Sequence, residues 1–457
     1  MYVTFNCFKA IFLLPWQQQG LKPRTTPRDT PRDTPRDTPR DTPRDTPRDS
    51  ITPRDSITPR DSISPRDSIA PRDTRTTPRD TTTTPRDSTT PRDSITPRDT
   101  RTTPRDSISP RDSIAPLAVA LIGLGRIGVM YLSNIRANTQ LRLCCVVLSP
   151  RQDPGEVRAQ HGIPAHVTVS CDPQSAFSDP GIEAVIIASS TASHVDLILS
   201  AVVANKAVYC EKPISDSLER TRQCYQAAAQ ADLPLFCAFN RRFDPSYSHI
   251  QAQVRAGAVG KVQTIKSVSR DSPVIPLSYI GPSGGIFDDF SVHDIDLLLW
   301  VTGDVPVQVF VAGNAQIPEF SDYNDYDNMI IVLTFKHGTL GTIDLNRYSS
   351  YGYDQRLEVF GPLGMLHCEH SRPNHLVTSD PSGSTSTPLH YSFPSHYDQA
   401  FKNQLGYFVD LVRGKVELSV TERMTRAVSK VVEACKESAV SGLPVKIAWS
   451  EEEIPEY

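Results

Sequence analysis

A long hydrophobic run is the first feature that the N-terminal part of the sequence lacks. The apolar run there covers residues 10–14, with only Lys9 ahead of it and three glutamines, rather than a small-residue cleavage site, behind it. A membrane-spanning helix needs about 20 apolar residues, and a secretory signal needs a basic segment and a cleavage site. A weak signal peptide is the alternative. We expect a cytoplasmic protein without a membrane partner.

Cysteines with the spacing of a metal site are absent as well. The nine cysteines are odd in number, and four of them stand in apolar, strand-like runs: Cys144, Cys145, Cys210 and Cys237. A cysteine in such a run behaves as a small buried hydrophobic residue in a reducing compartment. We therefore expect no metal site.

A strong charge of either sign is missing too, because 48 basic and 52 acidic side chains leave a formal net charge of −4. Residues 24–114 repeat Thr-Pro-Arg-Asp with Asp-Ser-Ile-Thr and Asp-Ser-Ile-Ala variants, so their charges nearly cancel. The repeat has too few bulky apolar residues to offset the entropy of ordering. We expect residues 1–115 to be a disordered low-complexity segment that binds no nucleic acid. Expanded or misassigned coding sequence explains it more simply than an array of Thr-Pro phosphorylation sites.

The remaining stretch of about 340 residues exceeds one comfortable domain. We expect an α/β Rossmann dinucleotide-binding domain at residues 116–237 and an α+β domain at residues 238–450. Residues 117–122 form an apolar run of strand length, as in a parallel sheet buried on both faces.

A Gly-x-Gly-x-x-Gly motif follows this run directly, and an apolar helical pattern begins behind it. The glycines permit a tight turn, the approach of a pyrophosphate and close packing of helix on strand, and the helix N-terminus faces the phosphates. The predicted cofactor-binding residues here are Gly123, Gly125, Arg126, Ile127 and Gly128.

The end of the second predicted strand, residues 141–148, bears on the choice of cofactor. NAD-specific folds carry an acidic residue there for the ribose hydroxyls, but this chain has Leu148. Ser149, with Arg151 or Arg126, could instead receive a 2′-phosphate, while Asp153 reaching back is the alternative. The sequence leaves NAD and NADP both open.

Two more strand–helix units follow, with strands at residues 182–188 and 206–210. In open α/β sheets the ligand lies at the carboxyl ends of the strands, so Lys212 is expected to point toward the cofactor and could polarise a substrate hydroxyl. A surface lysine before a proline is the alternative. The residues that leave the two strands complete the predicted cofactor set: Ser189, Thr191, His194, Glu211 and Lys212.

A second candidate site lies in residues 283–301, where a helical pattern would place Asp289, His293 and Asp296 on one side. A carboxylate beside an imidazole suits reversible alcohol oxidation, because the histidine takes the hydroxyl proton while the aspartate orients it. Taken alone, such residues are more often solvated.

Beyond residue 238, short strands joined by glycine-containing turns predict a mainly antiparallel sheet with the 286–301 helix on one face. This unit would present His293 and Tyr353 to the cofactor. Residues 379–390 read as a loop, and two helices at residues 397–413 and 421–441 follow. A broad sheet with an exposed face predicts a homodimer or homotetramer.

Together these motifs resemble the Gfo/Idh/MocA oxidoreductase family, over residues 117–447 and outside the repeat. The resemblance rests on the glycine motif, Glu211-Lys212-Pro213, residues 240–244 (Asn-Arg-Arg-Phe-Asp) and the segment from Gly284 to Asp296. Two further strings, at residues 269–271 and 351–361, are similar to the inositol 2-dehydrogenases of that family.

The resemblance implies roles for individual residues. Lys212 matches the active-site lysine of the family, and Asp289 and His293 match its aspartate–histidine pair, with His293 as proton acceptor. The positions implied to contact or adjoin a cyclitol substrate are Asn240, Arg241, Asp296 and Tyr353. Leu148 departs from the aspartate that inositol dehydrogenases using NAD usually carry, which puts NAD preference in doubt.

We therefore expect an NAD(P)-dependent dehydrogenase that oxidises a secondary hydroxyl of a cyclitol or sugar to a ketone. One alternative is a catalytically inactive nucleotide-binding regulator of the same fold, although the retained lysine, aspartate and histidine argue against it. Another is a dehydrogenase for a different sugar or for a dihydrodiol.

Overall fold

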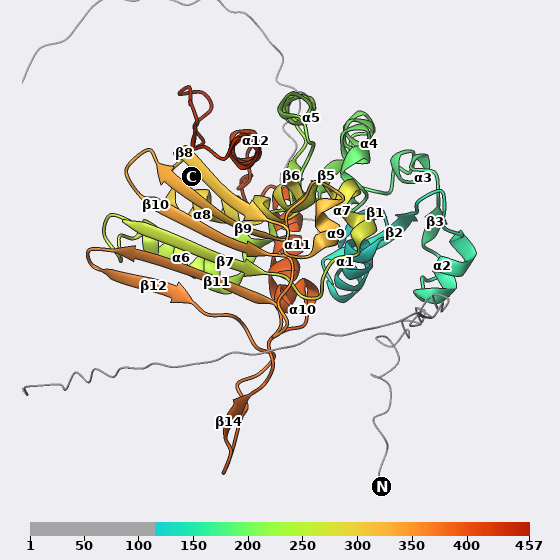
Figure 1. The fold of residues 1–457 in the computed structure, drawn as a ribbon. Coiled ribbons are helices and arrows are strands. Elements are labelled where there is room, and N and C mark those ends of the chain that lie inside the picture. The colour runs from blue at the N-terminus through green and yellow to red at the C-terminus, as the bar shows by residue number, and fades with distance from the viewer. Residues whose placement is uncertain (1–114) are drawn as a thin grey trace, which may run out of the picture. The chain divides into compact units, whose positions relative to one another are not determined.

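The computed structural model describes residues 115–457, which fold around two large β-sheets (Figure 1). The expected disordered repeat and the apolar run at residues 10–14 lie outside the described residues. The predicted combination of a Rossmann-like parallel sheet with a second, mainly antiparallel sheet is confirmed.

The first sheet is parallel throughout, in the order β3-β2-β1-β4-β5-β6. Every residue of β1, β4 and β5 is buried, as expected for apolar strands covered on both faces. The chain order reverses between β1 and β4, which opens a crevice at the carboxyl ends of the strands. The strands are β1 (Leu117–Ile122), β2 (Leu141–Val147), β3 (Thr168–Ser170), β4 (Ala184–Ile187), β5 (Ala207–Cys210) and β6 (Leu235–Cys237).

Helices connect these parallel strands and cover the sheet (Figure 1). The fourth begins at Thr191, earlier than its apolar pattern suggested, so His194 lies within its first turn. They are α1 (Arg126–Ala137), α2 (Pro154–Gln160), α3 (Gln174–Phe177), α4 (Thr191–Val203) and α5 (Leu218–Gln230).

The second sheet has the order β12-β11-β7-β10-β9-β8-β15, and only β7 and β10 pair in parallel. Along β9 the inward side chains are buried, whereas Ile330 and Val332 on the other face are exposed. The strands are β7 (Thr264–Arg270), β8 (Pro306–Asn314), β9 (Asn328–Phe335), β10 (Leu340–Asn346), β11 (Asp354–Gly361), β12 (Gly364–Cys368) and β15 (Val445–Lys446).

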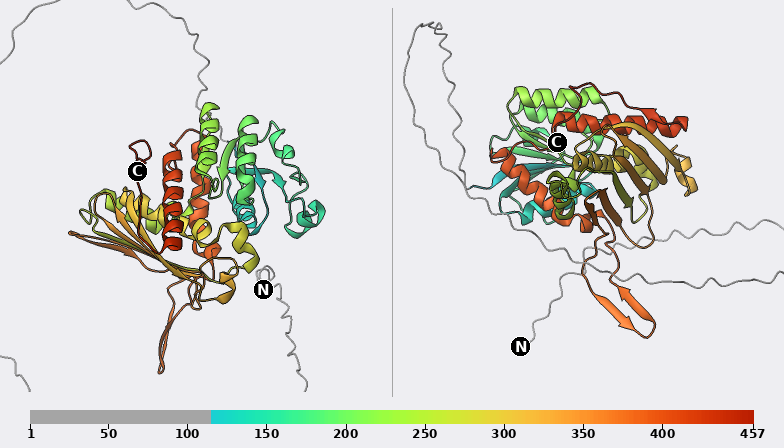
Figure 2. Two further views of the ribbon diagram at one scale, coloured as in Figure 1. Left: turned by 45° about the horizontal axis from the view of Figure 1, so that its top comes forward. Right: turned by 90° about the vertical axis from the view of Figure 1, so that its left-hand side faces the viewer.

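Helices lie against one face of this sheet and, within residues 115–457, leave the other uncovered (Figure 2). The covering helices are α6 (Pro245–Arg255), α8 (Val292–Thr302) and α12 (Glu422–Ser441). The single helix expected over residues 286–301 is instead the π-helical segment η2 (Ile286–Ser291) followed by α8. The short elements around it are η1 (Asn240–Phe243), α7 (Leu277–Ser283), α9 (Pro318–Ser321) and α10 (Phe393–His396).

The C-terminal helices tie the two sheets together. The Tyr209 hydroxyl on β5 donates to Gln404 on α11 (Asp398–Val412) at 2.6 Å, and Tyr225 on α5 lies 2.9 Å from the Thr425 hydroxyl on α12. One hydrophobic core therefore runs from the first sheet into the second. This shared core fixes the position of the first sheet relative to the second on either side of the crevice.

The segment expected as a loop at residues 379–390 contains a hairpin instead. Its strands are β13 (Val377–Asp380) and β14 (Gly383–Ser386), whose side chains are all exposed and which project away from the second sheet (Figure 1). No helix in residues 115–457 combines the length and apolarity that crossing a membrane requires.

Candidate active site

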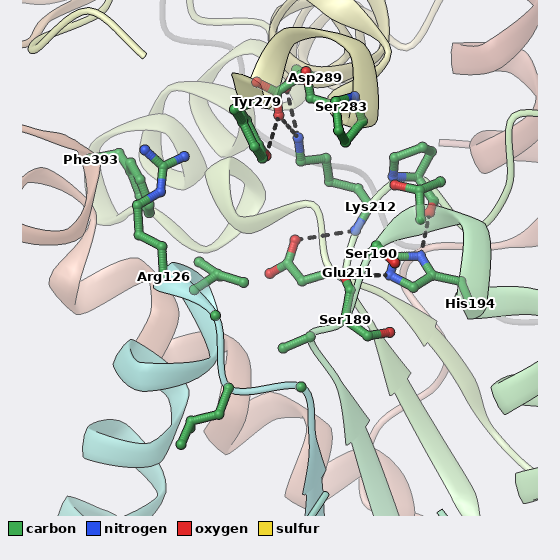
Figure 3. A pocket seen from close by; sticks show the side chains of 18 of the residues that line it. Arg126, Ser189, Ser190, His194, Glu211, Lys212, Tyr279, Ser283, Asp289 and Phe393 are labelled. Atoms are coloured by element: carbon green, nitrogen blue, oxygen red, sulfur yellow. Dashed lines mark hydrogen bonds and ion pairs between the residues drawn. The ribbon is translucent and has the colours of Figure 1, made fainter. Parts of the chain in front are cut away.

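A cavity of about 860 Å³ opens at the carboxyl ends of the parallel strands. Elements of the second half of the folded part (residues 238–457) close it on the side opposite the first half (residues 115–237) (Figure 3). Its lining contains most of the residues that the sequence singled out. From the first half these are Gly123, Gly125, Arg126, Ile127, Ser149, Ser189, Thr191, His194, Glu211 and Lys212. From the second half they are Asn240, Arg241, Asp289, His293 and Tyr353.

The glycine loop has the geometry that a bound dinucleotide requires. Gly123 has φ +96°, and a Cβ there would lie 2.7 Å from the Ala188 carbonyl oxygen. Gly128 does not line the cavity, because it packs so tightly that a Cβ would lie 2.1 Å from the Gly123 oxygen. Gly125 faces open space, and no side chain caps the N-terminus of α1. The free N–H groups of that first turn suit a pyrophosphate.

His194 fixes the loop that carries the lysine. Its Nδ1 lies 2.8 Å from the Pro213 carbonyl oxygen and its Nε2 lies 3.2 Å from that of Ser189. Burial lowers the pKa of the His194 imidazole below its ordinary value. The hydrogen bonds to the two carbonyls act in the opposite direction but are outweighed. A neutral imidazole carries one N–H, so the ring donates to one of these two carbonyls at a time while it lies between the ends of β4 and β5. Next to it, Glu211 is buried and accepts a hydrogen bond from the Tyr131 hydroxyl, so its carboxyl group is used in a contact within the protein.

Lys212 and Asp289 meet across the cavity from opposite halves of the chain (Figure 3). The Lys212 ammonium donates to the backbone oxygen of Asp289 at 2.7 Å and to its Oδ1 at 3.2 Å. The two side chains are only 11% and 16% exposed. The ammonium is therefore held at one point of the cavity wall.

Arg347, which the sequence reasoning missed, holds the other side of this carboxylate. Its Nη1 donates to Asp289 Oδ2 at 3.0 Å and lies 3.7 Å from Oδ2 of Asp271, which also lines the cavity. Burial alone would raise the pKa of Asp289, but Lys212 and Arg347 outweigh it and hold that pKa well below its usual value. Asp289 is therefore a carboxylate at any working pH.

His293 lines the same cavity, and its buried Nδ1 has no hydrogen-bond partner among residues 115–457. Burial lowers the pKa of its imidazole well below the ordinary value, and the charges of Lys212 and Arg241 lower it further. A neutral imidazole can accept a proton. Asp289 is engaged with Lys212 and Arg347 rather than hydrogen-bonded to His293, so its contact is with the lysine and not with the imidazole.

Asp296 does not join this group. Both of its oxygens accept from the Arg242 guanidinium, at 2.9 and 2.5 Å, and it lies outside the cavity lining. The reason is the π-helical segment, whose wider turn breaks the α-helical spacing assumed between Asp289 and Asp296.

Arg241 lines the cavity wall, but its guanidinium forms an ion pair with Asp294. Its Nη1 donates to Asp294 Oδ1 at 2.6 Å and to the Ser269 hydroxyl at 3.1 Å. The pKa of its guanidinium is raised: burial opposes this, but Asp294 outweighs it. Arg241 therefore shapes the wall rather than offering a free cation.

Asp271, Tyr279 and Arg347 are among the lining residues to which the sequence assigned no role. Asp271 belongs to residues 269–271, whose similarity to inositol 2-dehydrogenases implied no role for this aspartate. Tyr279 and Arg347 gave no periodic signal, because each acts through a distant partner. The Tyr279 hydroxyl lies 3.4 Å from Asp289 Oδ1. Arg347 directly follows β10, and this position after a strand is its one local signal.

Comparisons with known proteins agree with this geometry. Residues 117–239 match the family model described as an oxidoreductase family with an NAD-binding Rossmann fold, and residues 247–367 match the GFO/IDH/MocA C-terminal domain. The chain is 33% identical to myo-inositol 2-dehydrogenase of Thermotoga maritima over 298 residues, which are 65% of this chain and 88% of that protein. It is 32% identical to inositol 2-dehydrogenase of Rhizobium meliloti over 329 residues, covering 72% and 98%.

A solved structure shows the same likeness in three dimensions. Scyllo-inositol dehydrogenase of Lactobacillus casei, with bound NAD(H) and scyllo-inositol, superposes with a TM-score of 0.66 at 26% identity, covering 72% of this chain and 99% of that one. Fold, cavity and sequence likeness all lead to one conclusion: the chain belongs to the Gfo/Idh/MocA family of oxidoreductases, whose N-terminal half is an NAD-binding Rossmann fold.

Proposed function

We propose that the protein is an inositol 2-dehydrogenase-like enzyme that oxidises a secondary hydroxyl of a cyclitol or sugar to a ketone with a nicotinamide cofactor. The observation that carries this proposal is the meeting of Lys212, Asp289 and the neutral His293 around a cavity that begins at the glycine loop. The names of the relatives, which include myo-, scyllo- and unspecified inositol dehydrogenases, support the choice of a cyclitol.

In this reaction the substrate hydroxyl loses a proton and its carbon loses a hydride. The neutral imidazole of His293 accepts the proton, while the Lys212 ammonium donates a hydrogen bond to the reacting oxygen and stabilises negative charge on it. A bound nicotinamide supplies the acceptor for the hydride. Burial of the site keeps water from competing for these contacts.

Asp289 and Arg347 would act on the lysine rather than on the substrate. Asp289 holds the ammonium by two hydrogen bonds, one to its backbone oxygen and one to its carboxylate, and the Arg347 guanidinium fixes the carboxylate from its other side. Polar groups on the second-half wall are available for the remaining ring hydroxyls: Asn240, Asp271 and Tyr353. Asp296 does not belong to this set, because its carboxylate accepts hydrogen bonds from Arg242.

The test is turnover with myo-inositol and a panel of polyols, followed through the absorbance of the reduced nicotinamide. Lys212→Ala and His293→Ala should each lower kcat by roughly 10²–10⁴-fold while the Kd of the nucleotide stays within about twofold. Lys261→Ala and His375→Ala, which remove exposed residues of the same types, are the matched controls.

Near-normal turnover in either active-site variant would contradict the mechanism. Tight nucleotide binding with no turnover on any polyol, sugar or dihydrodiol would favour the inactive regulator instead. Turnover on a sugar or dihydrodiol but not on inositol would keep the enzyme and change the substrate.

We also propose that the enzyme is a homo-oligomer whose interface is the uncovered face of the second sheet. Adjacent strands place exposed apolar side chains on this face, namely Ile330, Val332, Leu340, Phe360 and Met365. Ion pairs flank them, Lys266 with Glu358 and Arg270 with Asp344. A second copy would bury both kinds of group, which suits a two-fold contact of like with like.

A reducing, cytoplasmic setting fits the eight free cysteines of the described residues.

A further inference from the structure

One end of the cavity, at the carboxyl end of β2, has no residue that selects NAD. In Rossmann domains this end receives the adenosine ribose, and a carboxylate there bonds the 2′-hydroxyl and excludes a 2′-phosphate. The cavity lining at this end is Leu148, Ser149, Pro150, Gln152, Cys171 and Pro173, none of which is acidic. Leu148, which takes the place of the usual carboxylate, is buried and cannot bond a hydroxyl.

The two acidic residues nearest to this end in the sequence accept hydrogen bonds from backbone amides at the beginning of helices. Asp153 Oδ1 accepts from the Glu156 amide at 2.8 Å at the beginning of α2, and Asp172 Oδ1 accepts from the Gln174 amide at 2.9 Å before α3. Neither lines the cavity. The alternative that Asp153 reaches back to the ribose is therefore not what the structure shows.

Acidic residues that do line the cavity belong to its other end. Glu211 follows β5, Asp271 follows β7, and Asp288 and Asp289 lie in the π-helical segment. None of these elements borders the β2 end of the sheet. No acidic side chain therefore lines the ribose end, where it would repel a phosphate.

A cation stands at the rim of this end. Residues 149–152 form a turn, in which the Gln152 amide donates to the Ser149 carbonyl at 3.0 Å and the Arg151 amide lies 3.4 Å from the Ser149 hydroxyl. Arg151 lies between the lining residues Pro150 and Gln152, is exposed, and pairs with no carboxylate within residues 115–457. An arginine near this position is the usual partner of a 2′-phosphate.

Arg126, the other arginine that the sequence offered, is engaged elsewhere. Its guanidinium lies 5.0 Å from the centre of the Phe393 ring and 5.4 Å from that of Tyr279, on the far wall of the cavity (Figure 3). That leaves Ser149, which lines this end of the cavity, and Arg151, which adjoins the lining, as the hydroxyl and the cation for a 2′-phosphate.

We propose that the nucleotide pocket binds NADP at least as tightly as NAD, with Ser149 and Arg151 receiving the 2′-phosphate. This inference rests on the proposed use of a nicotinamide cofactor and deepens it. The reason is electrostatic: the pocket gives the ribose hydroxyls no carboxylate, whereas a phosphate dianion gains a guanidinium and a hydroxyl without meeting an acid.

The experiment is calorimetric titration of the full chain with NADP⁺ and NAD⁺ separately, without substrate. Arg151→Ala should raise the Kd of NADP⁺ by roughly 10- to 100-fold, as expected for loss of a charged hydrogen bond, and leave that of NAD⁺ within about twofold. Arg142→Ala is the matched control, because Arg142 is an exposed arginine at the opposite end of β2. It should change neither Kd.

A second variant tests the missing carboxylate. Ser149 is exposed, so Ser149→Asp adds a negative charge without burying it. It should weaken NADP⁺ by at least tenfold and leave NAD⁺ unchanged or tighter. Added salt should weaken NADP⁺ binding more than NAD⁺ binding, because the 2′-phosphate contact is exposed and screened.

Tight binding of NAD⁺ with tenfold or weaker binding of NADP⁺ would overturn this inference and leave the proposed function intact. Equal losses for both nucleotides in Arg151→Ala would also overturn it, since that arginine would then serve the shared part of the cofactor. Failure of both nucleotides to bind would instead remove the proposed function itself.

Discussion

Arg347 Nη1 lies 3.0 Å from Asp289 Oδ2, while Lys212 Nζ lies 3.2 Å from Oδ1 of the same carboxylate. The aspartate thus bridges two cations that come from different halves of the chain. Arg347 is fully buried, and its Nε and Nη2 have no partner within the described residues. Its one strong contact is therefore with Asp289, which makes it a positioning residue for the lysine.

Replacing Arg347 should separate catalysis from cofactor binding. Arg347→Ala should lower kcat by roughly 10- to 100-fold, the scale of a lost charge-assisted contact, because Asp289 can then turn and carry Lys212 with it. The Kd of the nucleotide should stay within about twofold, since Arg347 does not reach the glycine loop. Steady-state kinetics and calorimetry on the same preparation provide both values.

Arg347→Lys is the conservative counterpart and should recover part of kcat, because it restores a cation beside Asp289. Equal losses in kcat, nucleotide affinity and thermal stability for both variants would show that Arg347 only supports the fold.

Asp271 should make substrate affinity depend on pH near neutrality. Burial raises its pKa to about 6, against the lowering effect of Arg347. A carboxyl with this raised pKa is ionised above pH 6 and protonated below it, so an acceptor for ring hydroxyls is lost as the pH falls. We expect KM for inositol to rise below about pH 6 in the wild type, and the KM of Asp271→Asn to be flat over the same range. Identical profiles for the two proteins would rule out this carboxyl as the titrating group.

The sequence allowed the strands and the cavity-facing motifs to be predicted, because both depend on local signals. Residues 117–122 are uniformly apolar, and their strand is buried throughout. The glycine motif follows a strand and opens a helix, as its spacing requires. Lys212 lies two residues after β5 and His293 is the second residue of α8, so local signals place both next to element ends at the cavity.

Contacts between distant segments could not be predicted in the same way. Arg347 lies 58 residues from Asp289, and nothing local marks it as a partner of that carboxylate. Asp296 was placed with Asp289 because an α-helix was assumed, whereas the π-helical segment changes the spacing. The alternation that predicts a hairpin is weak in residues 377–386, whose side chains are all polar or exposed.

Two glycines of the nucleotide loop should respond differently to the same substitution. A Cβ at Gly128 would lie 2.1 Å from the Gly123 carbonyl oxygen, so Gly128→Ala must move backbone and should destabilise the protein by about 1–3 kcal/mol, as overpacking does. A Cβ at Gly125 meets nothing within 4 Å, so Gly125→Ala should leave the free energy of unfolding nearly unchanged.

Gly125→Ala should nevertheless weaken nucleotide binding by tenfold or more, because its methyl group enters the space beside the N-terminus of α1. Urea unfolding and calorimetry on both variants give the comparison. A stable Gly128→Ala protein, or unimpaired binding by Gly125→Ala, would contradict the loop geometry.

The uncovered face of the second sheet should control assembly. Val332 is 39% exposed and lies on this face in β9, an interior strand of the sheet, with Phe310 and Thr342 as its cross-strand neighbours. Val332→Asp would place a charge in a contact between like surfaces, where its counterpart from the second copy would repel it. We expect light scattering to show an oligomer for the wild type and a monomer, or a smaller assembly, for Val332→Asp.

Val203→Asp, at an 89% exposed position at the end of α4, is the control and should leave the oligomer intact. If both variants keep the wild-type mass, the interface lies elsewhere, because a carboxylate pair buried at the centre of the contact would not be tolerated.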